Sequence, residues 1–210
     1  MTPPSTLDEV TTGTTIMGCV FDGGIVLGAD SRTSMGSYVA NRVSDKITQI
    51  SDKILMCRSG SAADTQAIAD YVAYFLDNYS METGQPPLVK IASHMARNIC
   101  YEYKDHLSAA LILGGIDQTG PSIYSIPLGG ALVKQNVAIG GSGSSFIYGY
   151  VDANYRDNMS RDEAVEFVKR SVALAMSRDG SSGGIVRIAV VTEDHTDRFV
   201  YAGRDLPRFQ

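Results

Sequence analysis

The sequence predicts one α+β domain in which two antiparallel sheets pack face to face, with a pair of helices outside each sheet. Three observations lead to this fold class. The chain has 210 residues, the length of one ordinary domain. Its hydrophobic fraction of 44% and charged fraction of 20% are those of a globular protein. Its expected elements follow the order strands, two helices, strands, two helices, strands, whereas a doubly wound parallel sheet would alternate single strands with helices.

The expected elements begin with two hairpins. Apolar runs at 14–20 and 25–29 are separated by Phe21-Asp22-Gly23-Gly24, a turn sequence typical of a β-hairpin. A second pair of strands is expected at 43–50 and 53–58, joined at Ser51-Asp52. Hairpins of this kind favour antiparallel pairing.

Two helices are expected next. After a capping start at Ser61 and Asp64, apolar residues recur at helical spacing: Ile68, Val72, Phe75 and Tyr79. Gly84, Pro86 and Pro87 end this helix, and a second one is expected over residues 88–99.

The second half of the chain repeats this order. Strands are expected at 109–113, 123–126 and 131–138, with a turn at 117–120. Helices are expected over 144–155 and 160–178, and the latter begins with a capping box at Ser160-Arg161-Asp162-Glu163. Two further strands are expected at 185–191 and 198–201, and only residues 1–13 look detachable from the domain.

Charge and composition exclude several kinds of partner. The 18 basic and 23 acidic side chains give a net charge of −5 and a pI near 5.1, so a nucleic-acid groove is not expected. No run has the roughly 20 apolar residues of a membrane span, and residues 1–13 lack the pattern of a signal peptide. The three cysteines and three histidines have neither metal-ligand nor disulfide spacing. We therefore expect no nucleic acid, membrane, metal or cofactor, and a reducing intracellular compartment.

Two glycine-rich segments suggest alternative chemistries. Gly180-Ser181-Ser182-Gly183-Gly184 satisfies the G-x-S-x-G pattern of serine hydrolases. That pattern needs a strand before the serine and a helix after it, whereas the expected order here is the reverse, which favours a helix-to-strand turn. Residues 140–145 are rich in Gly and Ser but lack the lysine and the full glycine spacing of phosphate-binding loops.

A polar segment, Thr11-Thr12-Gly13-Thr14-Thr15, leads into the first expected strand. Asp30 ends the second strand, and Lys46 opens the next hairpin. Two such charges at strand ends usually form a structural ion pair. A buried lysine beside an aspartate can also supply a positive field next to a nucleophile.

Five motifs together identify a family. They follow one another along the chain: Thr14-Thr15-Ile16-Met17, Gly28-Ala29-Asp30-Ser31-Arg32, Asp45-Lys46-Ile47, Cys57-Arg58-Ser59-Gly60-Ser61-Ala62-Ala63-Asp64 and Asp179-Gly180-Ser181-Ser182-Gly183-Gly184. From Thr14 to near the C-terminus the sequence resembles the catalytic β subunits of the eukaryotic 20S proteasome, and among them the constitutive caspase-like type, which cleaves after acidic residues. The resemblance implies the four-layer αββα fold of the N-terminal-nucleophile (Ntn) hydrolases.

The resemblance also implies a processing step. Residues 1–13 would be a propeptide, removed by autocleavage between Gly13 and Thr14, and residues 14–210 would form one hydrolase domain. Thr14 would then supply the hydroxyl nucleophile, and its freed α-amine, with a pKa of about 7.7–8.0, the general base. In the intact chain the same nitrogen is an amide and cannot accept a proton.

Further site residues follow from the resemblance. It implies that Lys46 lies beside Thr14, that Asp30 orients Lys46, and that the backbone N–H of Gly60 stabilises the oxyanion. Supporting positions around the threonine amine are implied for Ser142, Asp179 and Ser182. The pocket for the acidic side chain is implied to contain Arg58, with Thr33, Ser44 and Ala62 beside it. The induced immune counterpart carries an apolar residue at the position of Arg58, so Arg58 favours the constitutive type.

The resemblance implies a setting and partners as well. These are other α and β proteasome subunits in a barrel of stacked rings, regulatory caps and unfolded polypeptide substrates, in the cytoplasm and nucleus. It implies no cofactor. Two alternatives stay open: a non-catalytic scaffold subunit of the same ring, and an unrelated serine hydrolase that uses Ser182. The scaffold alternative predicts the loss of Thr14, Asp30 or Lys46, and all three are present.

Overall fold

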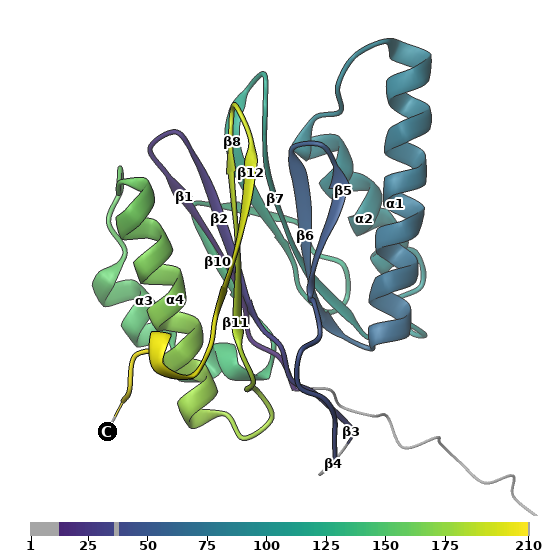
Figure 1. The fold of residues 1–210 in the computed structure, drawn as a ribbon. Helices are drawn as coiled ribbons and strands as arrows, with labels where there is room; N and C mark the ends of the chain where they lie inside the picture. Colours follow the sequence, from purple (N-terminus) through teal and green to yellow (C-terminus); the bar gives the residue numbers. More distant parts are fainter. Residues whose placement is uncertain (1–12, 36–37, 210) are drawn as a thin grey trace, which may run out of the picture.

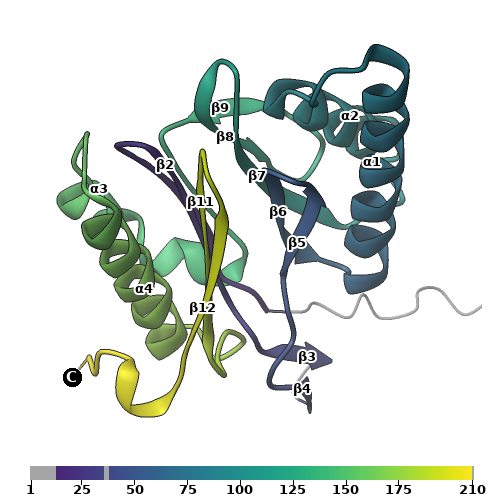
Figure 2. The ribbon, with the colours of Figure 1, turned by 45° about the horizontal axis from the view of Figure 1, so that its top comes forward.

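A computed structural model of the chain describes residues 13–35 and 38–209. Two five-stranded antiparallel sheets lie face to face, and helices cover the outer face of each sheet (Figures 1 and 2). The predicted α+β sandwich of four layers is therefore confirmed.

The first sheet has the strand order β10-β1-β2-β11-β12. Its strands are β1 (Ile16–Phe21), β2 (Gly24–Asp30), β10 (Val137–Gly140), β11 (Val186–Thr192) and β12 (Thr196–Tyr201). Helices α3 (Tyr148–Asn154) and α4 (Arg161–Arg178) cover its outer face (Figure 1). The predicted capping box is present at the start of α4, where the Ser160 hydroxyl accepts a hydrogen bond from the backbone N–H of Glu163.

The second sheet has the strand order β5-β6-β7-β8-β9. Its strands are β5 (Ile47–Ser51), β6 (Ile54–Gly60), β7 (Ala109–Asp117), β8 (Gly120–Ile126) and β9 (Val133–Gln135). Helices α1 (Ala62–Thr83) and α2 (Val89–Glu102) cover its outer face (Figure 1). As predicted, Ser61 caps α1, and Gly84 ends it with a φ of 64°, a left-handed conformation that favours glycine.

Apolar side chains fill the space between the two sheets. The inner faces of both sheets contribute to this central core, including Ile16, Leu27, Leu55, Cys57 and Ile112. Side chains alternate along a strand, so the opposite face of each sheet packs against its own helices. The central strand β2 is buried along its whole length, which gives its last residue, Asp30, a fixed place at the end of the sheet.

One predicted strand is wrong in a way that matters for the topology. The run 131–138 forms two short strands, β9 and β10, which pair with β8 and β1 in different sheets. The chain crosses from one sheet to the other at Asn136. Hydrophobic periodicity cannot reveal such a crossing, because the backbone stays extended on both sides of it.

Other parts of the fold also differ from the prediction. The expected strand over 43–50 is reduced to β5, which begins at Ile47, because residues 43–46 form a loop. An unpredicted hairpin, β3 (Thr33–Met35) and β4 (Tyr38–Asn41), precedes that loop and lies apart from the two sheets (Figure 2). The helix expected over 144–155 is a 3₁₀ turn, η1 (Ser142–Phe146), followed by α3.

A second 3₁₀ turn, η2 (Gly203–Asp205), follows β12. Within residues 13–35 and 38–209, none of the helices has the length and apolar character that crossing a membrane requires.

Candidate active site

Strand pairing gathers four segments at one end of the first sheet. Ile16 of β1 pairs with Gly140 of β10, and Asp30 of β2 pairs with Val186 of β11. The residues just before β1, at the end of β2, just after β10 and just before β11 therefore lie together. The second sheet adds Lys46, which directly precedes β5. This end of the sandwich brings together the residues that the family resemblance assigns to catalysis.

Thr14, Lys46 and Asp30 are in direct contact. The Nζ of Lys46 lies 3.0 Å from Oγ1 of Thr14 and 2.7 Å from Oδ1 of Asp30. It also donates to the carbonyl oxygen of Gly13 at 3.3 Å. Thr14, Asp30 and Lys46 are 2%, 0% and 8% exposed. One buried ammonium group thus contacts both the hydroxyl of Thr14 and the carbonyl of the Gly13–Thr14 peptide bond.

Burial lowers the pKa of the Lys46 ammonium group from its usual value, and the charge and hydrogen bond of Asp30 offset only part of this effect. A lowered pKa makes the ammonium group a better proton donor to its neighbours. A purely structural ion pair needs only the lysine and the carboxylate. Here the Thr14 hydroxyl is a third member of the contact.

Four donors converge on the carboxylate of Asp30. Its Oδ1 accepts from Lys46 and from the backbone N–H of Thr15 at 2.9 Å. Its Oδ2 accepts from the backbone N–H groups of Gly183 at 2.9 Å and Arg32 at 3.2 Å. Because both oxygens are held in place, Asp30 in turn holds Lys46 in a single orientation.

Ser142, Asp179 and Ser182 form a second network on the nitrogen side of Thr14. The backbone N–H of Thr14 donates to the Ser142 hydroxyl at 3.1 Å, which donates to Oδ2 of Asp179 at 2.7 Å. Ser182 donates to the same oxygen at 2.6 Å, and the backbone N–H of Ser181 donates to Oδ1 at 3.0 Å. Burial alone would raise the pKa of Asp179, but these hydrogen bonds outweigh burial and the pKa is lowered.

Thr15 connects the two networks, although no pattern in the sequence assigns it to the site. Its backbone N–H donates to Asp30, and its buried hydroxyl lies 2.8 Å from that of Ser182. Since Ser182 contacts Asp179, Thr15 links the two carboxylates. Only the fold reveals this contact, because Thr15 and Ser182 are 167 positions apart in the chain.

Gly13 packs closely against the loop that follows α4. A Cβ atom at residue 13 would overlap the side chain and backbone of Ser181. Glycine is therefore the residue that fits before Thr14 in this arrangement. The other residues of the expected propeptide, 1–12, lie outside the described residues.

Arg58, the expected specificity residue, lies on β6, and its guanidinium group donates hydrogen bonds to two neighbouring residues. Its Nε donates to the Thr48 hydroxyl at 2.8 Å, and its Nη2 donates to the backbone oxygen of Asp45 at 2.9 Å. Arg198 of β12 supports the same loop, since its Nη1 donates to Oδ2 of Asp45 at 3.0 Å and to the backbone oxygen of Ile47 at 3.1 Å. Neither Thr48 nor Arg198 was singled out from the sequence.

The remaining predicted site residues lie around this loop and the end of β6. The hydroxyl groups of Thr33 and Ser44 are 2.6 Å apart. Ala62 is the first residue of α1 and is exposed. Gly60 ends β6 with a φ of 108°, where a Cβ atom would overlap the backbone of Ser108. This conformation favours glycine.

The serine-hydrolase alternative does not match the local fold. Ser182 follows helix α4 and precedes strand β11, which is the reverse of a nucleophile elbow. His195, the histidine that a triad would need, has its Nε2 3.0 Å from Oδ2 of Asp197. Across the part of the chain that the structure describes, no three His, Cys, Asp or Glu side chains are arranged to hold a metal ion.

Two facing antiparallel sheets between helical layers, with Thr14 buried at one end, correspond to the Ntn-hydrolase fold. The family described as "Proteasome subunit" matches residues 10–191 of the chain. The protein is a member of the proteasome β-subunit family.

Three similar proteins illustrate this membership. The chain is 54% identical over 195 residues to the "Probable proteasome subunit beta type-1" of Schizosaccharomyces pombe, covering 92% of this chain and 86% of the relative. It is 50% identical over 211 residues to proteasome subunit beta type-6 of Dictyostelium discoideum, and the match covers 100% of this chain and 99% of the relative. It is 51% identical over 202 residues to proteasome subunit beta type-9 of Homo sapiens, and the match covers 96% of this chain and 92% of the relative.

Proposed function

We propose that this chain is a threonine peptidase of the 20S proteasome core and that it cleaves polypeptides after acidic residues. It would assemble with other α and β subunits in a barrel of stacked rings, which regulatory caps supply with unfolded substrates. Its setting would be ATP- and ubiquitin-linked degradation in the cytoplasm and nucleus. Membership of the proteasome β-subunit family supports the assembly.

The observation that carries the proposal is the contact of Lys46 with two reacting groups. Its Nζ lies 3.0 Å from the Thr14 hydroxyl and 3.3 Å from the Gly13 carbonyl oxygen. A positive charge at this place favours both an anionic nucleophile and negative charge that develops on the carbonyl oxygen. This arrangement supports cleavage of the Gly13–Thr14 bond by Thr14 itself.

Maturation would begin with transfer of the acyl group from nitrogen to oxygen. The Thr14 Oγ1 attacks the carbonyl carbon of Gly13, the new C–O bond replaces the C–N bond, and the hydroxyl proton ends on the Thr14 nitrogen. Water then hydrolyses the ester. This step releases residues 1–13 with a terminal carboxyl group and restores the Thr14 hydroxyl.

Substrate cleavage would use the freed α-amine of Thr14 as the base. Such an amine has a pKa of about 7.7–8.0, so it can accept the hydroxyl proton near neutral pH. It would pass this proton to the leaving amine of the substrate, and water would hydrolyse the acyl-threonine ester. The Thr14 nitrogen already donates to the Ser142 hydroxyl, which donates to Asp179, and these two residues would orient the amine. The Gly60 N–H would stabilise the oxyanion.

Arg58 supports the preference for acidic residues. A guanidinium group pairs with a carboxylate through two parallel hydrogen bonds. Thr48 and the Asp45 carbonyl orient the group. Thr33, Ser44 and Ala62 would line the same pocket, as the resemblance implies.

The first experiment is the intact mass of this chain in the assembled particle. A chain that begins at Thr14 supports the proposal. A chain that begins at Met1 would leave Thr14 without a base and favour a scaffold subunit or an unfinished precursor.

A pair of variants separates threonine from serine catalysis. Under the proposal, Thr14→Ala abolishes hydrolysis after acidic residues, and Ser182→Ala only weakens it. If Ser182→Ala abolished hydrolysis and Thr14→Ala were harmless, the chain would be a serine hydrolase.

A further inference from the structure

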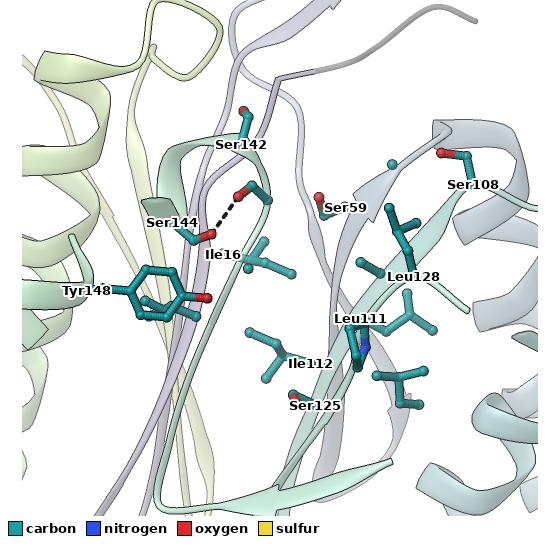
Figure 3. Close-up of a pocket in the computed structure, with 17 residues that line it drawn as sticks. Ile16, Ser59, Ser108, Leu111, Ile112, Ser125, Leu128, Ser142, Ser144 and Tyr148 are labelled. Atoms are coloured by element: carbon teal, nitrogen blue, oxygen red, sulfur yellow. Dashed lines mark hydrogen bonds between the residues drawn. The ribbon is translucent and has the colours of Figure 1, made fainter. Parts of the chain in front are cut away.

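A cavity of about 570 Å³ opens between the two sheets, next to Thr14. The buried side chains of Ile16 and Ile112 form its base, and Tyr148 and Leu128 lie on opposite sides of it (Figure 3). Leu128 is 67% exposed and Tyr148 is 55% exposed. The cavity therefore presents large apolar side chains at its mouth.

The cavity shares its rim with the candidate active site. Ser142, Gly141, Gly60 and Ser59 line it. Ser142 is the residue that accepts a hydrogen bond from the Thr14 nitrogen, and a Cβ atom at Gly141 would overlap the Thr14 carbonyl. The cavity thus borders the candidate active site through Gly141 and Ser142, the two lining residues that lie against Thr14.

Arg58 and the cavity lie on opposite faces of β6. Met56 packs in the cluster beneath α1 and α2, whereas Cys57 packs in the core between the sheets. Because side chains alternate along a strand, Arg58 shares the face of Met56, and Ser59 shares the face of Cys57 and lines the cavity. The end of β6 therefore has Arg58 on one face and the cavity on the other, with the candidate active site next to both.

The lining selects the kind of side chain that the cavity can take. Among the described residues that line it, none is charged. A charged side chain would lose hydration there and would meet serine hydroxyl groups but no opposite charge, whereas a large apolar one would be removed from water at no such cost.

We propose that this cavity binds the substrate residues that follow the scissile bond and that it favours a large apolar side chain there. The proposal rests on the threonine-peptidase function proposed above. It adds a second specificity site, on the leaving-group side of Thr14, to the acidic preference on the Arg58 side.

The test uses the assembled, mature particle and three internally quenched peptides. All three carry Asp before the scissile bond, and they differ only in the residue after it: Leu, Glu or Lys. Mass spectrometry identifies the cleavage at Asp. We expect kcat/KM for the peptide with Leu to exceed the other two by about tenfold. Equal values for all three peptides would overturn the proposal.

Two charge variants at the mouth of the cavity sharpen this test. Leu128→Lys should favour the peptide with Glu over the peptide with Lys, and Leu128→Glu should reverse that order, because each provides an opposite charge. The same order in both variants would overturn the proposal. Val133→Lys on β9, an exposed position outside the cavity lining, should keep the order of the wild type.

A peptide aldehyde that ends in Asp distinguishes the two proposals, because it has nothing beyond the bond to be cleaved. We expect it to inhibit the wild type and Leu128→Lys with the same inhibition constant. If it failed to inhibit the wild type, the acidic preference would be wrong, and this inference with it. If its inhibition constant changed in Leu128→Lys, residue 128 would act on the Arg58 side, and the cavity proposal alone would be overturned.

Discussion

The hydroxyl groups of Thr15 and Ser182 lie 2.8 Å apart. Through this contact the residue next to the candidate nucleophile is tied to the network on Asp179, while its backbone N–H is tied to Asp30. The two carboxylates approach Thr14 from different segments of the chain. Thr15 fixes their relative positions, so the alignment of the Thr14 hydroxyl with Lys46 depends on a residue that takes part in no bond-making step.

Thr15→Val removes this hydroxyl and keeps the shape of the side chain and the backbone N–H. The lost hydrogen bond contributes about 1 kcal/mol, which corresponds to about a fivefold lower rate if the loss falls on the transition state. We expect kcat for a peptide with an acidic residue to fall by about this factor, with KM unchanged. Thr15→Ser keeps the hydroxyl and should keep most of the rate, whereas an equal loss in both variants would indicate a packing effect.

Gly13→Ala should block the release of residues 1–13. A methyl group at residue 13 would overlap Ser181, so the Gly13 carbonyl would move away from Lys46 and the Thr14 hydroxyl. We expect the intact mass of the chain to include residues 1–13, and hydrolysis after acidic residues to be lost with it. Gly180→Ala is the matched control, because a Cβ atom there meets nothing within 4 Å; a processed Gly13→Ala chain would contradict the steric argument.

The fold was largely predictable because local patterns determine most of its elements. The capping residues Ser61 and Ser160 mark the starts of the two long helices, and both caps are present. The division of residues 131–138 between two sheets was not predictable, because the crossing at Asn136 is set by long-range pairing. The hairpin of β3 and β4 was not predicted either. Its strands have only three and four residues, which is too short for an alternating pattern to stand out.

The site was predictable only through the family resemblance. Composition and periodicity give no reason for Lys46 to contact Thr14 rather than any other residue near a strand end. The contacts of Thr15, Thr48 and Arg198 depend on strand register and loop paths, which are long-range properties. The resemblance implies the candidate nucleophile and several residues that support it, whereas the contacts of Thr15, Thr48 and Arg198 come from the structure alone.

Arg58→Leu should weaken cleavage after acidic residues and leave the exposure of Thr14 unaffected. A hydrogen-bonded contact with a charged group contributes roughly 1.5–3 kcal/mol, so kcat/KM for a peptide with Asp before the scissile bond should fall by about ten- to a hundredfold. A peptide with Leu at that place serves as the comparison and should lose no activity. Unchanged turnover of the peptide with Asp would remove Arg58 from the specificity pocket.

Arg198→Met should have a smaller effect on the same peptide. Arg198 supports the loop at Asp45, whose carbonyl oxygen orients Arg58. The pair of Arg198 with Asp45 is partly exposed, so we expect KM to rise by only about twofold, with kcat unchanged. Arg170→Met removes a surface pair with Glu166 on α4 and should change neither constant. A fall in kcat without a change in KM would contradict a role limited to the pocket.

Asp179→Asn should change how stability depends on pH. The hydrogen bonds from Ser182, Ser181 and Ser142 outweigh burial and lower the pKa of Asp179. Because the native-state pKa is lowered, the ionised carboxylate stabilises the fold at pH values above the unfolded-state pKa of about 3.9. This stabilisation is lost as the pH falls through the lower native-state pKa. The variant should therefore have a lower Tm than the wild type near neutral pH, and the gap should narrow below about pH 4. Asp105→Asn, at an exposed position after α2, should follow the wild-type profile, and a gap for Asp179→Asn that stays constant across this range would contradict the lowered pKa.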